Sequence, residues 1–100
     1  MTYYANAHQR SQLIAGLRAV AAYLESNPDV PAPQYTTVHV FPGRGTDKEQ
    51  REAIDAIAAC VNAEPQEIVS GHYGVSRYFG PVEYRAVAID RSGEDKRDGE

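Results

Sequence analysis

The chain has 100 residues, of which 42% are hydrophobic and 24% are charged, with a formal net charge of −4. This length is typical of one domain with a core of its own. The acidic balance argues against a general phosphate-backbone binder, because such proteins need clustered lysines and arginines. Nucleic-acid binding is therefore the weakest interpretation, and it would need Arg10, Arg18, Arg77 and Arg85 to converge on one surface.

The sequence also argues against a membrane protein. No apolar run approaches the ~20 residues that span a bilayer, and the first residues lack the basic and apolar regions of a signal peptide. We therefore expect a cytoplasmic protein with no membrane contact. Cys60 is the single cysteine, so an intrachain disulfide is excluded. We expect its side chain to be buried on the apolar face of a helix, because free cysteines are mostly buried.

Residues 1–7 are expected to form a loose N-terminal arm. Residues 8–26 then show helical spacing of their apolar side chains, namely Leu13, Ile14, Leu17, Val20, Ala21 and Leu24. Gly16 weakens a helix, so we expect it to mark close packing against another element. Prolines at positions 28, 31 and 33 predict a stiff, extended connector after this helix.

The middle of the chain predicts a strand followed by a second helix. Residues 35–41 alternate as a strand does, and the glycine-rich residues 42–45 end it. Thr46 and Glu49 have the spacing of a capping box, which marks the start of a helix. This helix has apolar side chains at Ile54, Ile57, Ala58 and Val61, and residues 62–65 end it.

The last part of the chain predicts a short strand at residues 68–69 and a β-hairpin. Residues 72–79 and 82–89 are rich in aromatic and β-branched side chains on either side of a Gly-Pro turn. An ion pair between Arg77 and Glu83 is compatible with such a turn. Residues 91–100 contain no apolar side chain to bury, so we expect a disordered charged tail.

The element order is thus α-β-α-β-β-β. It predicts a single two-layer α+β domain over residues 8–90, with both helices on one face of a small, mostly antiparallel sheet. The passage over residues 35–69 is also compatible with a parallel crossover, which would make the sheet mixed. We expect a modest core of Leu, Ile, Val and Tyr side chains.

The hairpin is the leading candidate for a functional surface. It gathers the residue types that anchor protein interfaces together with charged side chains, namely Tyr73, Arg77, Tyr78, Glu83, Tyr84 and Arg85. No nucleophile–base pair or other catalytic set accompanies them. We therefore expect a non-enzymatic interaction protein that binds a protein partner or a second copy of itself, because a small sheet leaves an edge to cover.

A second candidate is the turn formed by Gly43, Arg44, Gly45 and Thr46. A strand, a glycine loop and a helix start aim main-chain amides at an anion, and an arginine can grip a phosphate. The turn lacks the Gly-Lys-Ser/Thr ending of a P-loop, and nearby carboxylates oppose an anion. It stays open as the alternative, a small-ligand or phosphate site, including an enzyme that uses His39 or His72.

The histidines show no metal-ligand spacing. His39 and His72 lie on different predicted strands, so they would form an acid–base pair or a metal site only if the sheet brought them together. We expect no metal and no cofactor.

Residues 17–31 and 78–87 resemble small uncharacterised proteins of actinobacteria and of their phages or mobile elements. The resemblance extends over most of residues 8–90. It lies in the general style of the sequence and includes no functional motif. It implies a small accessory protein of the cytoplasm and supplies no catalytic residue.

Overall fold

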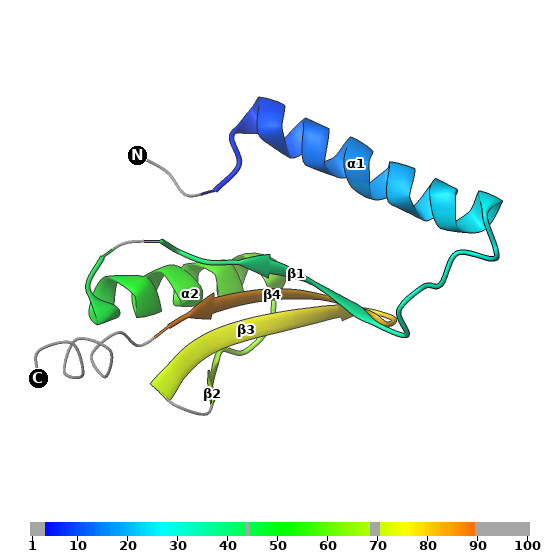
Figure 1. Cartoon of the computed structure of the whole chain (residues 1–100). Helices are drawn as coiled ribbons and strands as arrows, with labels where there is room; N and C mark the ends of the chain where they lie inside the picture. Colours follow the sequence, from blue (N-terminus) through cyan, green and yellow to red (C-terminus); the bar gives the residue numbers. More distant parts are fainter. Residues whose placement is uncertain (1–3, 44, 69–70, 90–100) are drawn as a thin grey trace, which may run out of the picture. The chain divides into compact units, whose positions relative to one another are not determined.

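The computed structural model describes residues 4–43, 45–68 and 71–89 of the chain (Figure 1). The chain divides into two compact units, Met1–Gln34 and Tyr35–Glu100, which are described separately. The first residues of the predicted N-terminal arm, Arg44, Val69 and the predicted tail at residues 91–100 lie outside the described residues.

The first unit contains one helix, α1, which spans Ala7–Ser26 and confirms the predicted helix. It begins with a capping box: the Asn6 side chain accepts from the Gln9 amide at 2.8 Å, and the Gln9 side chain accepts from the Asn6 amide at 2.9 Å. At the other end, the main-chain and side-chain nitrogens of Asn27 both donate to the Tyr23 carbonyl. Local hydrogen bonds therefore fix both ends of α1.

The core described for the second unit is built from Ile, Val, Ala and Tyr side chains. Every leucine of the chain lies in α1, which belongs to the first unit, so leucine in the core stays a prediction. The expected close packing at Gly16 stays a prediction as well, since its partner would be an element outside the first unit.

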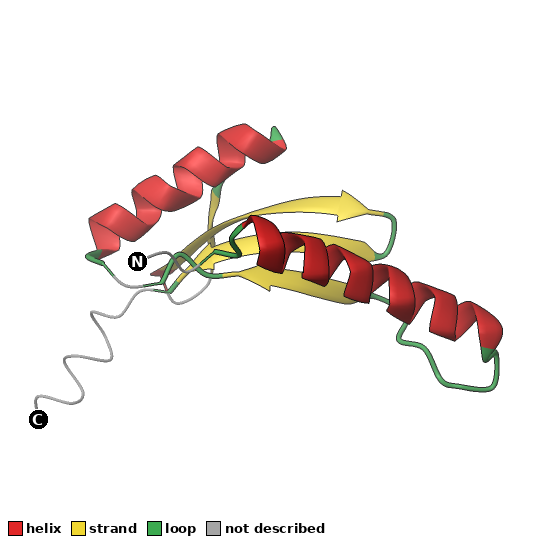
Figure 2. Cartoon of the chain, turned by 90° about the horizontal axis from the view of Figure 1, so that it is seen from above, coloured by secondary structure: helices red, strands yellow, loops and turns green. Residues whose placement is uncertain are grey.

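The second unit contains β1 (Thr36–Val40), α2 (Asp47–Val61), β2 (Gln66–Ile68), β3 (His72–Phe79) and β4 (Val82–Ala88). The predicted order α-β-α-β-β-β and the α+β class are confirmed. The strands form one sheet in the order β1-β4-β3-β2 (Figures 1 and 2). β4 and β2 pair antiparallel with β3, whereas β1 pairs parallel with β4, so the parallel partner of β1 is not the strand that follows α2.

The hairpin of β3 and β4 has a fixed register. Its turn at Gly80 and Pro81 places Phe79 opposite Val82, and Gly80 adopts a positive φ of 59°. Glu83 then faces Tyr78, while Arg77 faces Tyr84. The predicted Arg77–Glu83 pair is therefore wrong, because these two side chains point to opposite faces of the sheet.

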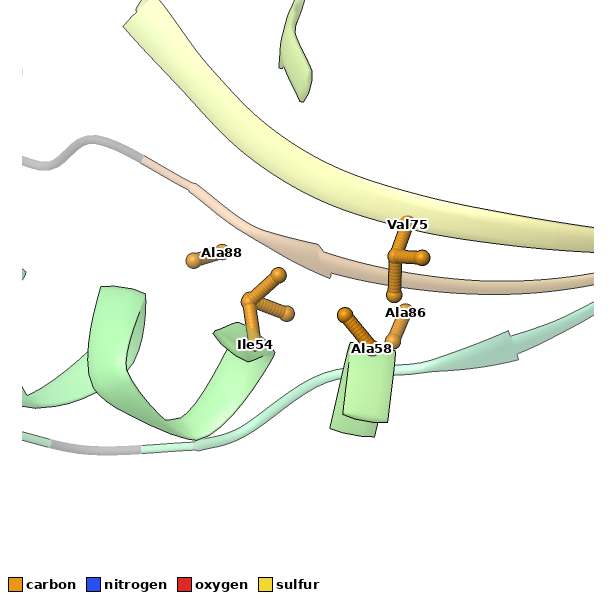
Figure 3. Close-up of a cluster of buried hydrophobic side chains, with 5 residues drawn as sticks. All are labelled: Ile54, Ala58, Val75, Ala86 and Ala88. Atoms are coloured by element: carbon orange, nitrogen blue, oxygen red, sulfur yellow. The ribbon is translucent and has the colours of Figure 1, made fainter. Parts of the chain in front are cut away.

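α2 lies on one face of the sheet and supplies the core. Thr46 caps it, since its hydroxyl accepts from the Glu49 amide at 3.1 Å while the Glu49 carboxylate accepts from the Thr46 amide at 2.8 Å. Ile54 and Ala58, one helical turn apart, point toward Val75 of β3 and toward the alanines of β4 (Figure 3). Ile54 is fully buried, so the core consists mainly of small side chains around one isoleucine.

The expected burial of Cys60 is also wrong, because its side chain is exposed. The buried residues of α2 are Gln50, Ile54 and Ala58, which follow one another at intervals of four. Cys60 comes six residues after Ile54 and so lies on the other side of the helix.

Candidate functional site

The hairpin residues predicted to bind a partner divide between the two faces of the sheet. Tyr73 and Tyr84 pack against the core under α2, and Arg77 shares that face by strand alternation. Tyr78, Glu83 and Arg85 lie on the opposite face, which we call the open face. Only half of the predicted residues therefore point to one surface, and their role in partner binding stays a prediction.

Arg77 has a structural contact. Its Nη1 atom donates to the main-chain carbonyl of Val61 at 2.8 Å, and its guanidinium lies 5.6 Å from the centre of the Phe79 ring. Val61 is the last residue of α2, where unpaired carbonyls carry partial negative charge. Arg77 therefore ties β3 to the end of α2.

Tyr73 is also held by neighbouring side chains. Its hydroxyl donates to Asp55 of α2 at 2.5 Å, and this hydrogen bond is the main reason why the pKa of Tyr73 is raised. The Arg51 guanidinium lies 4.7 Å from the centre of the Tyr73 ring and forms an ion pair with Glu67 of β2. These contacts join α2 to β3 and β2, so Tyr73 serves the packing of the second unit.

On the open face, Glu83 is the centre of a hydrogen-bonded cluster. Its carboxylate accepts from the hydroxyl of Ser76 on β3 and from that of Thr37 on β1, the latter at 3.3 Å. The Ser76 hydrogen bond lowers the pKa of Glu83 most, and Thr37, Arg85 and Tyr78 lower it further against the effect of burial. The carboxylate therefore stays charged at neutral pH and holds side chains from adjacent strands in place.

A hollow of about 270 Å³ lies beside this cluster. Its lining comes from β2, β3, β4 and the residue Glu64, and it is mostly polar. The polar residues are Glu64, Gln66, Ser76, Tyr78, Glu83 and Arg85, and the remaining lining residues are Ile68, Gly74 and Val75. The hollow has no room for a side chain at position 74. A Cβ atom added to Gly74 would lie 2.7 Å from the Ala86 carbonyl oxygen and 3.1 Å from Ile68 Cδ1. Tyr78 is 68% exposed.

The prediction from sequence missed Ser76 and Thr37. Strand alternation placed Ser76 on the same face as Tyr78, so a search for side chains near Tyr78 could have included it. Thr37 reaches Glu83 only because β1 pairs with β4, which puts these two residues directly opposite each other. Nothing local in the sequence indicates that pairing.

Among its described residues, the glycine turn before α2 contains the predicted capping box and no further feature that indicates a ligand. Gly43 and Gly45 have positive φ angles of 92° and 132°, and Arg44 lies outside the described residues. The Glu49 carboxylate accepts from the Thr46 amide, which lowers the pKa of Glu49 and keeps a negative charge at the helix start. An anion would have to compete with this carboxylate, and the phosphate site stays a prediction.

His39 and His72 do not meet. His39 is on β1 and stacks on Phe41 with a centroid distance of 5.8 Å, whereas His72 is on β3, beyond the intervening strand β4. Across residues 4–43, 45–68 and 71–89, no group of three or more histidine, cysteine, aspartate and glutamate side chains could hold a metal ion.

Comparison with known proteins gave no match to a family model, to a curated protein or to a solved structure. Neither helix in the described part of the chain is long and apolar enough to cross a bilayer. The fold and the site together define an α+β protein with a polar hollow on the face of a four-stranded sheet opposite α2.

Proposed function

We propose that this chain is a small non-enzymatic interaction protein that binds a protein partner with the open face of its sheet. The observation that carries the proposal is the exposed Tyr78 beside the hollow around Glu83 and Arg85. The resemblance in sequence style to accessory proteins of phages and mobile elements supports a cytoplasmic accessory role, which belongs to the same proposal.

The open face has the properties of a prepared binding surface. Tyrosine supplies a large, rigid contact area at low conformational-entropy cost, and tyrosine and arginine are enriched among the residues that dominate binding energy. The hydroxyls of Ser76 and Thr37 already hold Glu83 in position, so little ordering is needed when a partner binds. A partner segment with an apolar group against Tyr78 and a carboxylate against Arg85 would fit this arrangement.

The same cluster is poorly suited to catalysis. A serine nucleophile needs a neighbouring base whose pKa is close to the working pH. The pKa of Glu83 is instead lowered by the Ser76 hydrogen bond, so this carboxylate is a weak base at neutral pH. Among the described hydrogen bonds, neither His39 nor His72 contacts Ser76, so neither histidine replaces Glu83 as a base for this hydroxyl. Binding is therefore the better explanation of the cluster.

Site-specific photo-crosslinking in the source cells tests this function. A benzophenone amino acid in place of Tyr78 should capture one discrete protein, whereas the same group in place of Glu52, on the exposed side of α2, should not. Arg85→Ala should weaken the capture at position 78 without lowering the melting temperature substantially. Equal capture from both positions, or capture that Arg85→Ala leaves unchanged, would contradict the proposal.

A further inference from the structure

The outer edge of β1 presents main-chain groups that no described strand pairs with. β1 is the first strand of the sheet order and has β4 as its neighbour on the inner side. The Thr36 amide points to that inner side, where it donates to the Pro81 carbonyl at 3.1 Å. Because the main-chain groups of successive residues point to opposite edges, those of Thr37 and His39 point outward.

This edge lacks the features that usually prevent pairing with another strand. β1 contains only Thr, Val and His residues, all compatible with a strand, and residues 35–43 carry no acidic or basic side chain other than His39. Natural edge strands are commonly protected by charges, an internal proline, a bulge or short length. The opposite edge is β2, which is three residues long and carries Glu67. The two edges of the sheet therefore differ in their capacity to accept a strand.

We propose that two copies of this chain associate by antiparallel pairing of their β1 strands about a two-fold axis at Val38. In this register Val38 faces Val38 of the second copy, and Thr37 faces His39. The outward main-chain N–H and C=O groups of Thr37 then form hydrogen bonds with those of His39 in the second copy, and the same pair of bonds forms on the other side of the axis. The contact lies at the edge of the sheet and does not depend on the proposed function of the open face.

The side chains near β1 favour a second copy over a different partner. Tyr35 and Phe41, which directly flank β1, are 75% and 48% exposed, and extending the two-fold register by one residue at each end brings them opposite each other. Aromatic pairs across antiparallel strands are favourable. The chain as a whole carries a net charge of −4, but this edge contributes no acidic residue, so two copies do not repel each other at the contact.

Disulfide trapping tests the register. In a Cys60→Ser background, Val38→Cys should give a disulfide-linked dimer under mild oxidation, because Cα atoms of a non-hydrogen-bonded antiparallel pair lie about 4.5 Å apart. Thr36→Cys is the matched control, since the two copies of this position would be about 14 Å apart along the strands. Cross-linking at both positions to the same extent, or at neither, would overturn the proposed register.

Sedimentation equilibrium tests the association itself. The wild-type chain should form a species of twice its 11.0 kDa mass. Thr37→Lys with His39→Lys places like charges opposite each other on both sides of the axis and should weaken the dimer about tenfold or more. Thr37→Lys with His39→Glu makes the same facing pairs opposite in charge and should restore it. A wild-type chain that stays monomeric, or a Lys/Lys variant as dimeric as the wild type, would refute the proposal.

Discussion

The guanidinium of Arg77 donates a hydrogen bond of 2.8 Å to the carbonyl of Val61, so a side chain of β3 satisfies the main chain at the end of α2. A helix leaves its last carbonyls without intrahelical partners, and a cation is favourable beside them. Through this contact Arg77, which the sequence predicted to bind a partner, attaches α2 to β3.

Replacing Arg77 should therefore lower stability. We expect Arg77→Ala to reduce the free energy of unfolding by about 1 kcal/mol, the usual contribution of one such hydrogen bond. Arg77→Lys should retain part of it, because a lysine keeps the charge but not the planar guanidinium. Urea unfolding followed by circular dichroism measures both. An Arg77→Ala variant as stable as the wild type would show that the contact contributes nothing.

Two glycine substitutions should have opposite effects. Gly74→Ala places a Cβ atom 2.7 Å from a carbonyl oxygen of β4, which cannot move without disturbing the sheet. We expect a loss of about 1–3 kcal/mol in the free energy of unfolding. Gly16→Ala lies in the interior of α1, where alanine is the better helix former, and it should increase helix content. Thermal and urea unfolding of both variants, with circular dichroism at 222 nm, compares them. A stable Gly74→Ala protein would disprove the close approach of β3 and β4 described for this position.

The charge on Glu83 should make stability depend on pH. Its pKa is lowered in the folded chain, so its contribution is present above its ordinary pKa of 4.5 and is lost as the pH falls through the lowered folded value. Glu83→Gln should therefore be less stable than the wild type at neutral pH, and the difference should shrink in acid. Urea unfolding of both proteins across this pH range measures the effect. A difference that stays constant with pH would mean that the hydrogen bonds from Ser76 and Thr37 do not depend on the charge.

The helix cap at Thr46 offers a further test. Thr46→Ala removes the hydroxyl that accepts from the Glu49 amide and should lower the free energy of unfolding by about 1 kcal/mol. Glu49→Gln is a matched control, because the amide oxygen can still accept from the Thr46 amide. Its effect should be the smaller of the two in the same urea experiment. If Glu49→Gln were the more harmful change, the charge and not the hydroxyl would govern the start of α2.

Cys60 should react as an exposed thiol. We expect it to be labelled by a thiol reagent in the folded protein at a rate close to that of the unfolded chain, because it lies on the outer side of α2. The absorbance of the released chromophore measures this rate with and without urea. Labelling that requires denaturant would mean that Cys60 is covered in solution, and self-association could then be checked by dilution.

The elements that could be predicted are those with local signals. The Thr46–Glu49 spacing identified the start of α2, and the Gly80–Pro81 turn identified the hairpin, since both depend on residues close together in the sequence. Strand alternation also separated the two faces correctly. The prediction of Arg77 beside Glu83 failed because a shift of one residue in hairpin register moves a side chain to the other face.

The features that could not be predicted depend on long-range pairing. The contact of Thr37 with Glu83 needs β1 beside β4, two strands that are separated by a helix and two other strands. The position of Cys60 depends on which side of α2 faces the sheet, and small alanine side chains left that side ambiguous in the sequence. The open-face site could therefore be recognised only in part, through Tyr78, Glu83 and Arg85.

The position of β4 has a consequence for how the protein is made. It is the last strand along the chain among the described residues, yet it lies inside the sheet, where it separates β1 from β3. Thr36 thus finds its partner at Val82, 46 residues later. During translation β1 has no neighbouring strand until β4 has left the ribosome, so β1 joins the sheet in a late step. Until that step, the nascent chain exposes an unpaired strand rich in β-branched residues, and its rate of synthesis over these residues sets how long that exposure lasts.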